Sequence, residues 1–97
     1  MASSASKALQ FSNIAATTAG VAYLGGKSAS TVHATFGGGS VQWQILALDG
    51  STWINVGSSI TSDNFVVLGD LPQGQYRLSV TTATGVYASL VTVPGES

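Results

Sequence analysis

The fold is indicated most directly by residues 41–56, which read VQWQILALDGSTWINV. Two apolar runs flank Asp49-Gly50-Ser51-Thr52, and Asp-Gly is a favoured sequence for a tight hairpin turn. A loop of two or of four residues has an even length, so it fixes which side chains of the two strands share a face. The segment therefore predicts two strands, Val41–Leu48 and Trp53–Val56, that pair as an antiparallel hairpin.

The two faces of this hairpin differ in composition. One face is apolar throughout and is the expected core face; it carries Trp43, Ile45, Ala47, Ile54 and Val56. The other face has glutamine and asparagine far from the turn, but Leu46, Leu48 and Trp53 close to it. An apolar cluster on an outer face is either a contact patch for another chain or is covered by a bulge or a second sheet. Leu46, Leu48 and Trp53 are therefore candidate protein–protein contacts.

Further strands are predicted on both sides of the hairpin. Side chains alternate over Ser28–Phe36 and over Gln75–Thr81, and Phe65–Leu68 is a short apolar run. The last strand, Val86–Val93, is apolar on both sides and is expected to be central or covered by another chain. Threonine, glycine and valine interrupt the alanines of residues 15–22, so strands are expected there instead of a helix. Seven or eight short strands at regular spacing predict an all-β fold, an antiparallel β-sandwich.

A structural corner is expected in residues 71–80, LPQGQYRLSV. This run resembles the entry to a late strand of immunoglobulin-like domains, in which a tyrosine bonds back to its own preceding turn. The resemblance implies that the hydroxyl of Tyr76 bonds backbone near Asp70 or Leu71. It also implies an immunoglobulin-like or related Greek key arrangement of the sandwich.

The chain is short enough for one domain with one core. Residues 1–10, MASSASKALQ, are small and polar and are expected to form an extended, flexible N-terminal arm, with residues 11–97 as the single β-sandwich domain. Lys7 and Leu9 are candidates to reach a neighbouring subunit and order on binding, although the segment can equally be a simple disordered end. Neither a signal peptide nor an apolar run of about 20 residues is present, so no membrane partner is expected.

Charged side chains are scarce: there are three lysine or arginine residues, four aspartate or glutamate residues and one histidine, with a formal net charge of −1. Nucleic acids are usually bound by clustered lysine and arginine, so no nucleic-acid partner is expected. The absence of cysteine removes disulfides and thiolate metal sites together.

The residue inventory also argues against catalysis. His33 is the only imidazole and falls on the polar side of its strand, where a surface role is expected. Asp49 and Asp70 fall in turns, where their side chains bond backbone, and Asp63 is not part of a calcium-loop spacing. We therefore expect no enzyme, no catalytic or metal-binding residue and no cofactor.

Three stretches, DGSTWINVG (49–57), LPQGQYRLSVTTAT (71–84) and YASLVTVP (87–94), resemble small virion structural proteins of tailed bacteriophages, particularly capsid decoration or cement proteins. The resemblance implies a non-enzymatic protein that binds the outside of the major capsid protein lattice and stabilises the head. It further implies a homo-oligomer, with a cyclic trimer preferred, located on the capsid surface of a virion assembled in the bacterial cytoplasm.

Two alternatives remain at this point. Within the virion, the same sandwich could serve as a head-fibre, tail or baseplate component. Outside it, the chain could be a carbohydrate-binding surface module that stacks a sugar on Trp53. The surroundings of Trp53 discriminate: burial by another chain indicates a lattice contact, and an open groove lined by amides indicates sugar binding.

Overall fold

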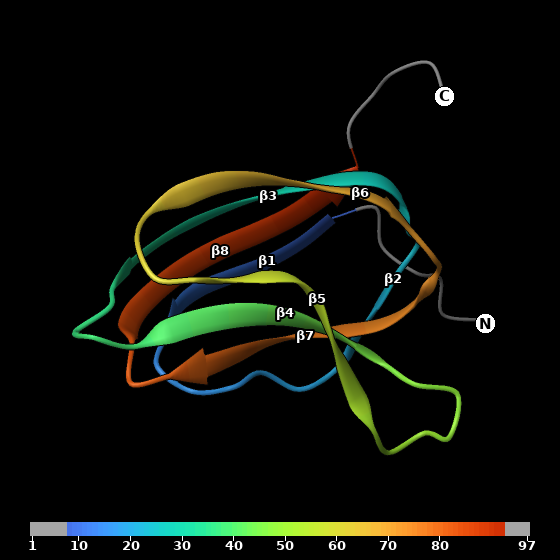
Figure 1. The fold of residues 1–97 in the computed structure, drawn as a ribbon, viewed down its shortest axis with the longest axis horizontal. Coiled ribbons are helices and arrows are strands. Elements are labelled where there is room, and N and C mark those ends of the chain that lie inside the picture. The colour runs from blue at the N-terminus through green and yellow to red at the C-terminus, as the bar shows by residue number, and fades with distance from the viewer. Residues whose placement is uncertain (1–7, 93–97) are drawn as a thin grey trace.

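The computed structural model describes residues 8–92, which form eight strands and no helix (Figure 1). The strands are β1 (Ala8–Ile14), β2 (Val21–Tyr23), β3 (Gly26–Thr35), β4 (Ser40–Leu46), β5 (Trp53–Ile60), β6 (Asn64–Leu71), β7 (Gly74–Thr81) and β8 (Thr84–Thr92). The all-β prediction is thus confirmed. The described part of the chain contains no helix with the length and hydrophobicity needed to cross a membrane.

The strands form two four-stranded antiparallel sheets. We name each after its central strand: the β8 sheet has the order β1-β8-β3-β6, and the β7 sheet has the order β2-β7-β4-β5. The pairings are nested, because β1 pairs with β8, β2 with β7, β3 with β6 and β4 with β5. The last strand lies between β1 and β3, so the prediction of a central position for it is confirmed.

The two sheets pack face to face around one hydrophobic core, as in a β-sandwich. Large side chains that are fully buried come from both sheets; they include Trp43, Tyr76 and Leu78 of the β7 sheet and Val86 and Leu90 of the β8 sheet. The indole N–H of Trp43 donates to the Ser30 hydroxyl at 2.8 Å, which joins the sheets through a buried hydrogen bond. Every buried side-chain nitrogen or oxygen among the described residues has a partner.

The β4–β5 hairpin has the predicted faces but a wider turn. Leu46 is directly opposite Trp53, and Ile45 is opposite Ile54, so the expected sharing of faces is confirmed. The assignment of Ile54 to the core is wrong, because it is 51% exposed near the turn, whereas Trp43, Ile45 and Val56 of the same face pack in the core. The prediction that the first strand continues to Leu48 is wrong, because β4 ends at Leu46 and the loop spans residues 47–52. The Asp49 carboxylate causes the difference: it accepts bonds from the Ser51 and Thr52 N–H groups, both at 2.9 Å, and from the Thr52 hydroxyl at 2.6 Å.

The start of the domain also differs from expectation. β1 begins at Ala8, which pairs with Val91, and Leu9 is paired with Leu90 and only 4% exposed. The prediction of an arm that includes residues 8–10 is therefore wrong, because Leu9 contributes to the core and its backbone extends the β8 sheet. The remainder of the expected arm, Lys7 included, lies outside the described residues.

The segment after β1 runs beside β7 without forming the strands predicted for residues 15–20. Its threonine hydroxyls replace part of a strand pairing: Thr18 Oγ1 accepts from the Leu78 N–H and Thr17 Oγ1 accepts from the Val80 N–H, each at 3.0 Å. Only the short β2 then pairs with the other end of β7. Side-chain hydroxyls thus satisfy the backbone of a strand whose neighbour is irregular.

Candidate binding surfaces

Acidic and basic side chains meet at one place in the described structure. His33 Nδ1 lies 2.7 Å from Asp63 Oδ2, and Asp63 Oδ1 accepts from the Ala34 N–H at 3.0 Å. The hydrogen bond from His33 lowers the pKa of Asp63, with the Ala34 N–H adding to the effect. The pair holds the β5–β6 turn against β3. Sequence analysis did not find this pair, because its members are 30 positions apart.

This pair is not accompanied by the other parts of a catalytic site. In residues 8–92, no serine or threonine hydroxyl is hydrogen-bonded to His33, so a nucleophile relay is not formed there. No group of three His, Cys, Asp or Glu side chains comes together in the same part of the chain. Within residues 8–92, the pair is a contact between β3 and the β5–β6 turn.

Trp53 lies across the outer face of the β7 sheet. The guanidinium carbon of Arg77 is 4.4 Å from the centre of its ring, in cation–π contact. Gly20 touches the ring edge so closely that a Cβ at that position would lie 2.8 Å from Trp53 Cη2. The Arg77 Nε–H also donates to Gln44 Oε1 at 2.7 Å, and the Gln44 amide donates to Asn55 Oδ1 at 2.9 Å. The outer face of this sheet is therefore tied together by its own side chains.

The predicted contact residues have four different placements. Leu46 and Trp53 are brought together on one face and are both partly buried. Leu48 lies two residues past the end of β4, on the turn, and is fully exposed. Leu9 belongs to the core and Lys7 lies outside the described residues. The hairpin that carries Leu48 extends away from the other strands (Figure 1).

Tyr76 forms a corner of the expected kind. Its hydroxyl donates to the Pro72 carbonyl at 2.5 Å, in the turn before its strand and next to Leu71. Its ring meets the Tyr23 ring edge-on, with centroids 5.4 Å apart. Burial, with the nearby Tyr23 hydroxyl, raises the pKa of Tyr76 to about 12. The hydroxyl therefore remains a hydrogen-bond donor throughout the neutral range.

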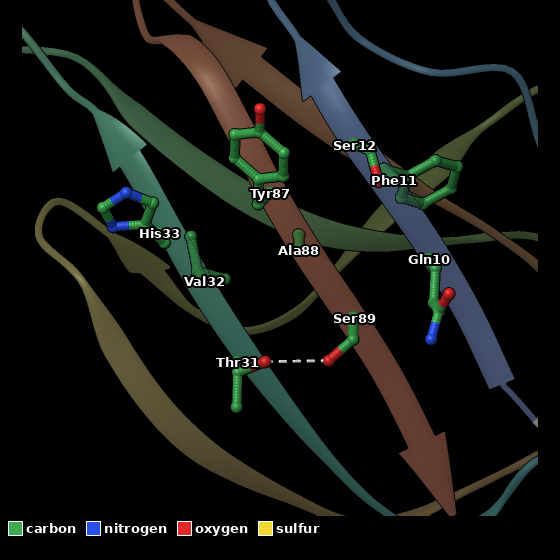
Figure 2. A pocket seen from close by; sticks show the side chains of 9 residues that line it. All are labelled: Gln10, Phe11, Ser12, Thr31, Val32, His33, Tyr87, Ala88 and Ser89. Atoms are coloured by element: carbon green, nitrogen blue, oxygen red, sulfur yellow. Dashed lines mark hydrogen bonds between the residues drawn. The ribbon is translucent and has the colours of Figure 1, made fainter.

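A groove crosses the outer face of the β8 sheet between β1, β8 and β3 (Figure 2). It has a volume of about 270 Å³ and is lined by Gln10, Phe11, Ser12, Thr31, Val32, His33, Tyr87, Ala88 and Ser89. Tyr87 is 48% exposed, and its ring centre lies 6.2 Å from that of His33. Strand alternation places several of these residues outward, but the groove itself depends on β1 lying beside β8, which no local pattern predicts.

Comparisons of the chain with protein-family models, with curated proteins and with solved structures found no match. What the chain does has to be inferred from its own residues and surfaces.

Proposed function

We propose that this chain is a non-enzymatic virion structural protein, a decoration or cement protein that binds the outside of a phage capsid lattice and stabilises the head. The sequence resemblance of residues 49–57, 71–84 and 87–94 supports this proposal. The observation that carries it is the projecting β4–β5 hairpin, which presents the apolar side chains of Leu48 and Ile54 to solvent.

This hairpin has the features of a preorganised contact element. Three hydrogen bonds to the Asp49 carboxylate hold the turn, and the Arg77, Gln44 and Asn55 side chains hold its base. Leu48 is fully exposed and Ile54 is 51% exposed, so apolar surface is offered that no other part of residues 8–92 covers. A rigid turn loses little conformational entropy on binding, which favours its insertion between neighbouring subunits.

The strand order supports a finer assignment of the fold, a jelly roll built from two Greek keys. Jelly rolls have eight strands in two sheets, and nested pairing of β1 with β8 through β4 with β5 matches that architecture. An immunoglobulin-like sandwich would place its first strand beside its second, whereas β1 is here beside β8. Jelly rolls occur in viral capsid proteins and in lectins, so this fold is compatible with more than one function.

The proposed mechanism is mechanical. Each copy would contact capsid subunits through the hairpin, and a symmetric assembly, with a cyclic trimer preferred, would engage several subunits at once. Binding only to the assembled lattice stabilises it by mass action, without any chemical step. Attachment at tail or fibre positions is the alternative, and it would involve far fewer copies.

The test is the copy number of the protein in purified virus particles, measured by mass spectrometry relative to the major capsid protein. A ratio near one copy per capsid subunit is expected. A handful of copies would overturn the decoration role in favour of a tail or fibre, and absence from the particles would overturn the virion proposal.

Matched variants connect that result to the hairpin. Leu48→Ser should lower the occupancy of particles, because it removes apolar surface from the tip of the turn. Phe65→Ser is the control, since Phe65 is also largely exposed but lies on β6, away from the hairpin. Equal occupancy of the two variants would contradict attachment through the hairpin.

A further inference from the structure

We propose that the groove beside Tyr87 is a binding site for a neutral saccharide, which stacks one ring face on the tyrosine and bonds its hydroxyls to the polar rim. This inference goes beyond the proposed virion role and does not depend on it. It also differs from sugar binding at Trp53, where Arg77 already lies against the ring.

The rim of the groove is built from two rows of side chains that the sheet register places side by side. Ser89 of β8 is directly opposite both Gln10 of β1 and Thr31 of β3. Tyr87 is directly opposite His33 in the next row. Figure 2 shows these side chains on three adjacent strands, with the Thr31 and Ser89 hydroxyls joined at 2.9 Å. The two rows Gln10-Ser89-Thr31 and Tyr87-His33 lie on paired strands, which fixes the spacing of their polar groups, whereas Ser12 lies where the register of β1 shifts.

The groove combines one exposed aromatic ring with a polar rim. The row of Phe11, Ala88 and Val32 runs between the two outward rows, but its side chains point into the core, so the apolar surface offered to a ligand is the ring of Tyr87. The rim offers hydroxyls from Ser12, Thr31, Ser89 and Tyr87, the Gln10 amide and the His33 imidazole. A sugar ring has the complementary character, with apolar C–H faces and hydroxyls around its edge. An exposed tyrosine gives such a ligand both an aromatic face and a polar tip.

His33 is held in position for a ligand. Because a carboxylate only accepts hydrogen bonds, Nδ1 is the donor to Asp63, and Asp63 is itself fixed by the Ala34 N–H. Nε2 can then pair with a ligand hydroxyl, which both donates and accepts. A side chain that is fixed before binding loses less entropy when the ligand arrives.

Charge and size restrict the ligand. Among residues 8–92, no lysine or arginine lines the groove, so a phosphate, sulfate or carboxylate would find there no cationic partner except His33, which is already bonded to Asp63. A volume of about 270 Å³ is close to the lower end of the range for small-molecule sites, about 300–1,000 Å³. The groove therefore suits a single neutral ring, such as the terminal residue of a glycan.

The test uses the isotope-labelled full chain and follows backbone amide shifts by NMR during titration. The probes are glucose, galactose, mannose, N-acetylglucosamine and N-acetylgalactosamine, with N-acetylneuraminic acid as the charged comparison. At least one neutral sugar should give saturable shifts concentrated at residues 10–12, 31–33 and 87–89. N-acetylneuraminic acid should give much weaker shifts. If none of the neutral sugars produces saturable shifts in these residues, the proposal is overturned.

Variants separate a sugar site from a general apolar surface. Tyr87→Ala should weaken binding about tenfold, whereas Tyr87→Phe, which keeps the ring, should stay within about threefold of the parent. Phe65→Ala is the matched control, since it removes an exposed aromatic ring of the same sheet that does not line the groove. Circular dichroism should show all three variants folded. If Tyr87→Ala and Phe65→Ala weaken sugar binding equally, or if Tyr87→Ala lowers particle occupancy without affecting sugar, the face is a protein interface and the proposal fails.

Discussion

The outer faces of the two sheets are built by the same alternation of side chains, but they differ in how far their aromatic side chains are covered. On the β7 sheet, Trp53 lies over the strands, with Arg77 against its ring and Gln44 bonded to Arg77 and Asn55. On the β8 sheet, Phe65 and Val67 are each 62% exposed and Tyr87 borders an open groove.

The difference shows that an exposed aromatic residue in a strand pattern is not by itself a binding site. The aromatic ring of the β7 sheet is used by the chain itself, because a long cationic side chain and a glycine are within reach of it. The Tyr87 ring of the β8 sheet has His33 and small hydroxyl side chains as neighbours and remains 48% exposed. The neighbours of the ring, and not the ring alone, decide which face is available to a partner.

The largest expected loss of stability comes from the core between the two sheets. Trp43→Ala removes an indole that is packed between the sheets and bonded to Ser30, and should lower the free energy of unfolding by about 3–5 kcal/mol. Chemical denaturation measures the loss. Trp43→Phe, which keeps a ring but not the N–H, should be clearly less damaging. Equal losses would contradict a packing role for the indole.

The direct comparison of the two outer faces comes next. Trp53→Ala should cost about 1–2 kcal/mol, from lost apolar contact and the lost Arg77 interaction. Phe65→Ala on the open face should change the free energy of unfolding by no more than about 0.5 kcal/mol. Denaturation midpoints of the two variants give the answer. Similar midpoints would mean that Trp53 is no better packed on its sheet than Phe65 is on the other.

Removal of the Tyr76 hydroxyl is expected to have a smaller effect on the free energy of unfolding, and one that depends on pH. Tyr76→Phe should cost about 1 kcal/mol at neutral pH, because the bond to the Pro72 carbonyl is lost. The folded-state pKa of about 12 lies above the ordinary value of 10.0, so parent stability should hold below pH 10 and decline as the pH rises through 12. Thermal melts across this range should show a decline from this group in the parent but not in Tyr76→Phe.

The smallest expected effect concerns the hairpin tip. The Thr52 hydroxyl, followed by the Ser51 and Thr52 N–H groups, lowers the pKa of Asp49 below 3.8. Its contribution to stability is therefore present above pH 3.8 and lost as the pH falls through the lower folded-state value. Asp49→Ala should melt slightly below the parent at pH 7, and the two should converge under acid conditions. A difference that stays constant with pH would show that the carboxylate charge is not responsible.

The sequence predicted what depends on local periodicity. The sharing of faces by Leu46 with Trp53, and the central place of the last strand, followed from alternation and from apolar character on both sides. The turn was predicted in the right place, but its loop is longer than expected. The three bonds to the Asp49 carboxylate depend on side-chain geometry, which periodicity does not predict. Side-chain periodicity therefore predicts which residues share a face of a sheet better than it predicts where a strand ends.

Features that join distant parts of the chain could not be predicted in the same way. Leu9 was assigned to an arm because its neighbours are small and polar, and only its pairing with Leu90 makes it part of the core. Thr17 and Thr18 were expected in a strand, but their hydroxyls, which accept from N–H groups of β7, take part of its place. The groove required β1, β8 and β3 to be adjacent, which is a property of the topology alone.

The nested strand order also determines when the fold can form. Among the described strands, β4 and β5 alone are both paired and consecutive, so every other pairing closes a longer loop. Chains dominated by such distant pairings fold in milliseconds to seconds. During synthesis at about 5–20 residues per second, β1 has to wait several seconds for β8 to be made. Until then Leu9 and the backbone of β1 lack their partner strand and are open to contacts with other chains.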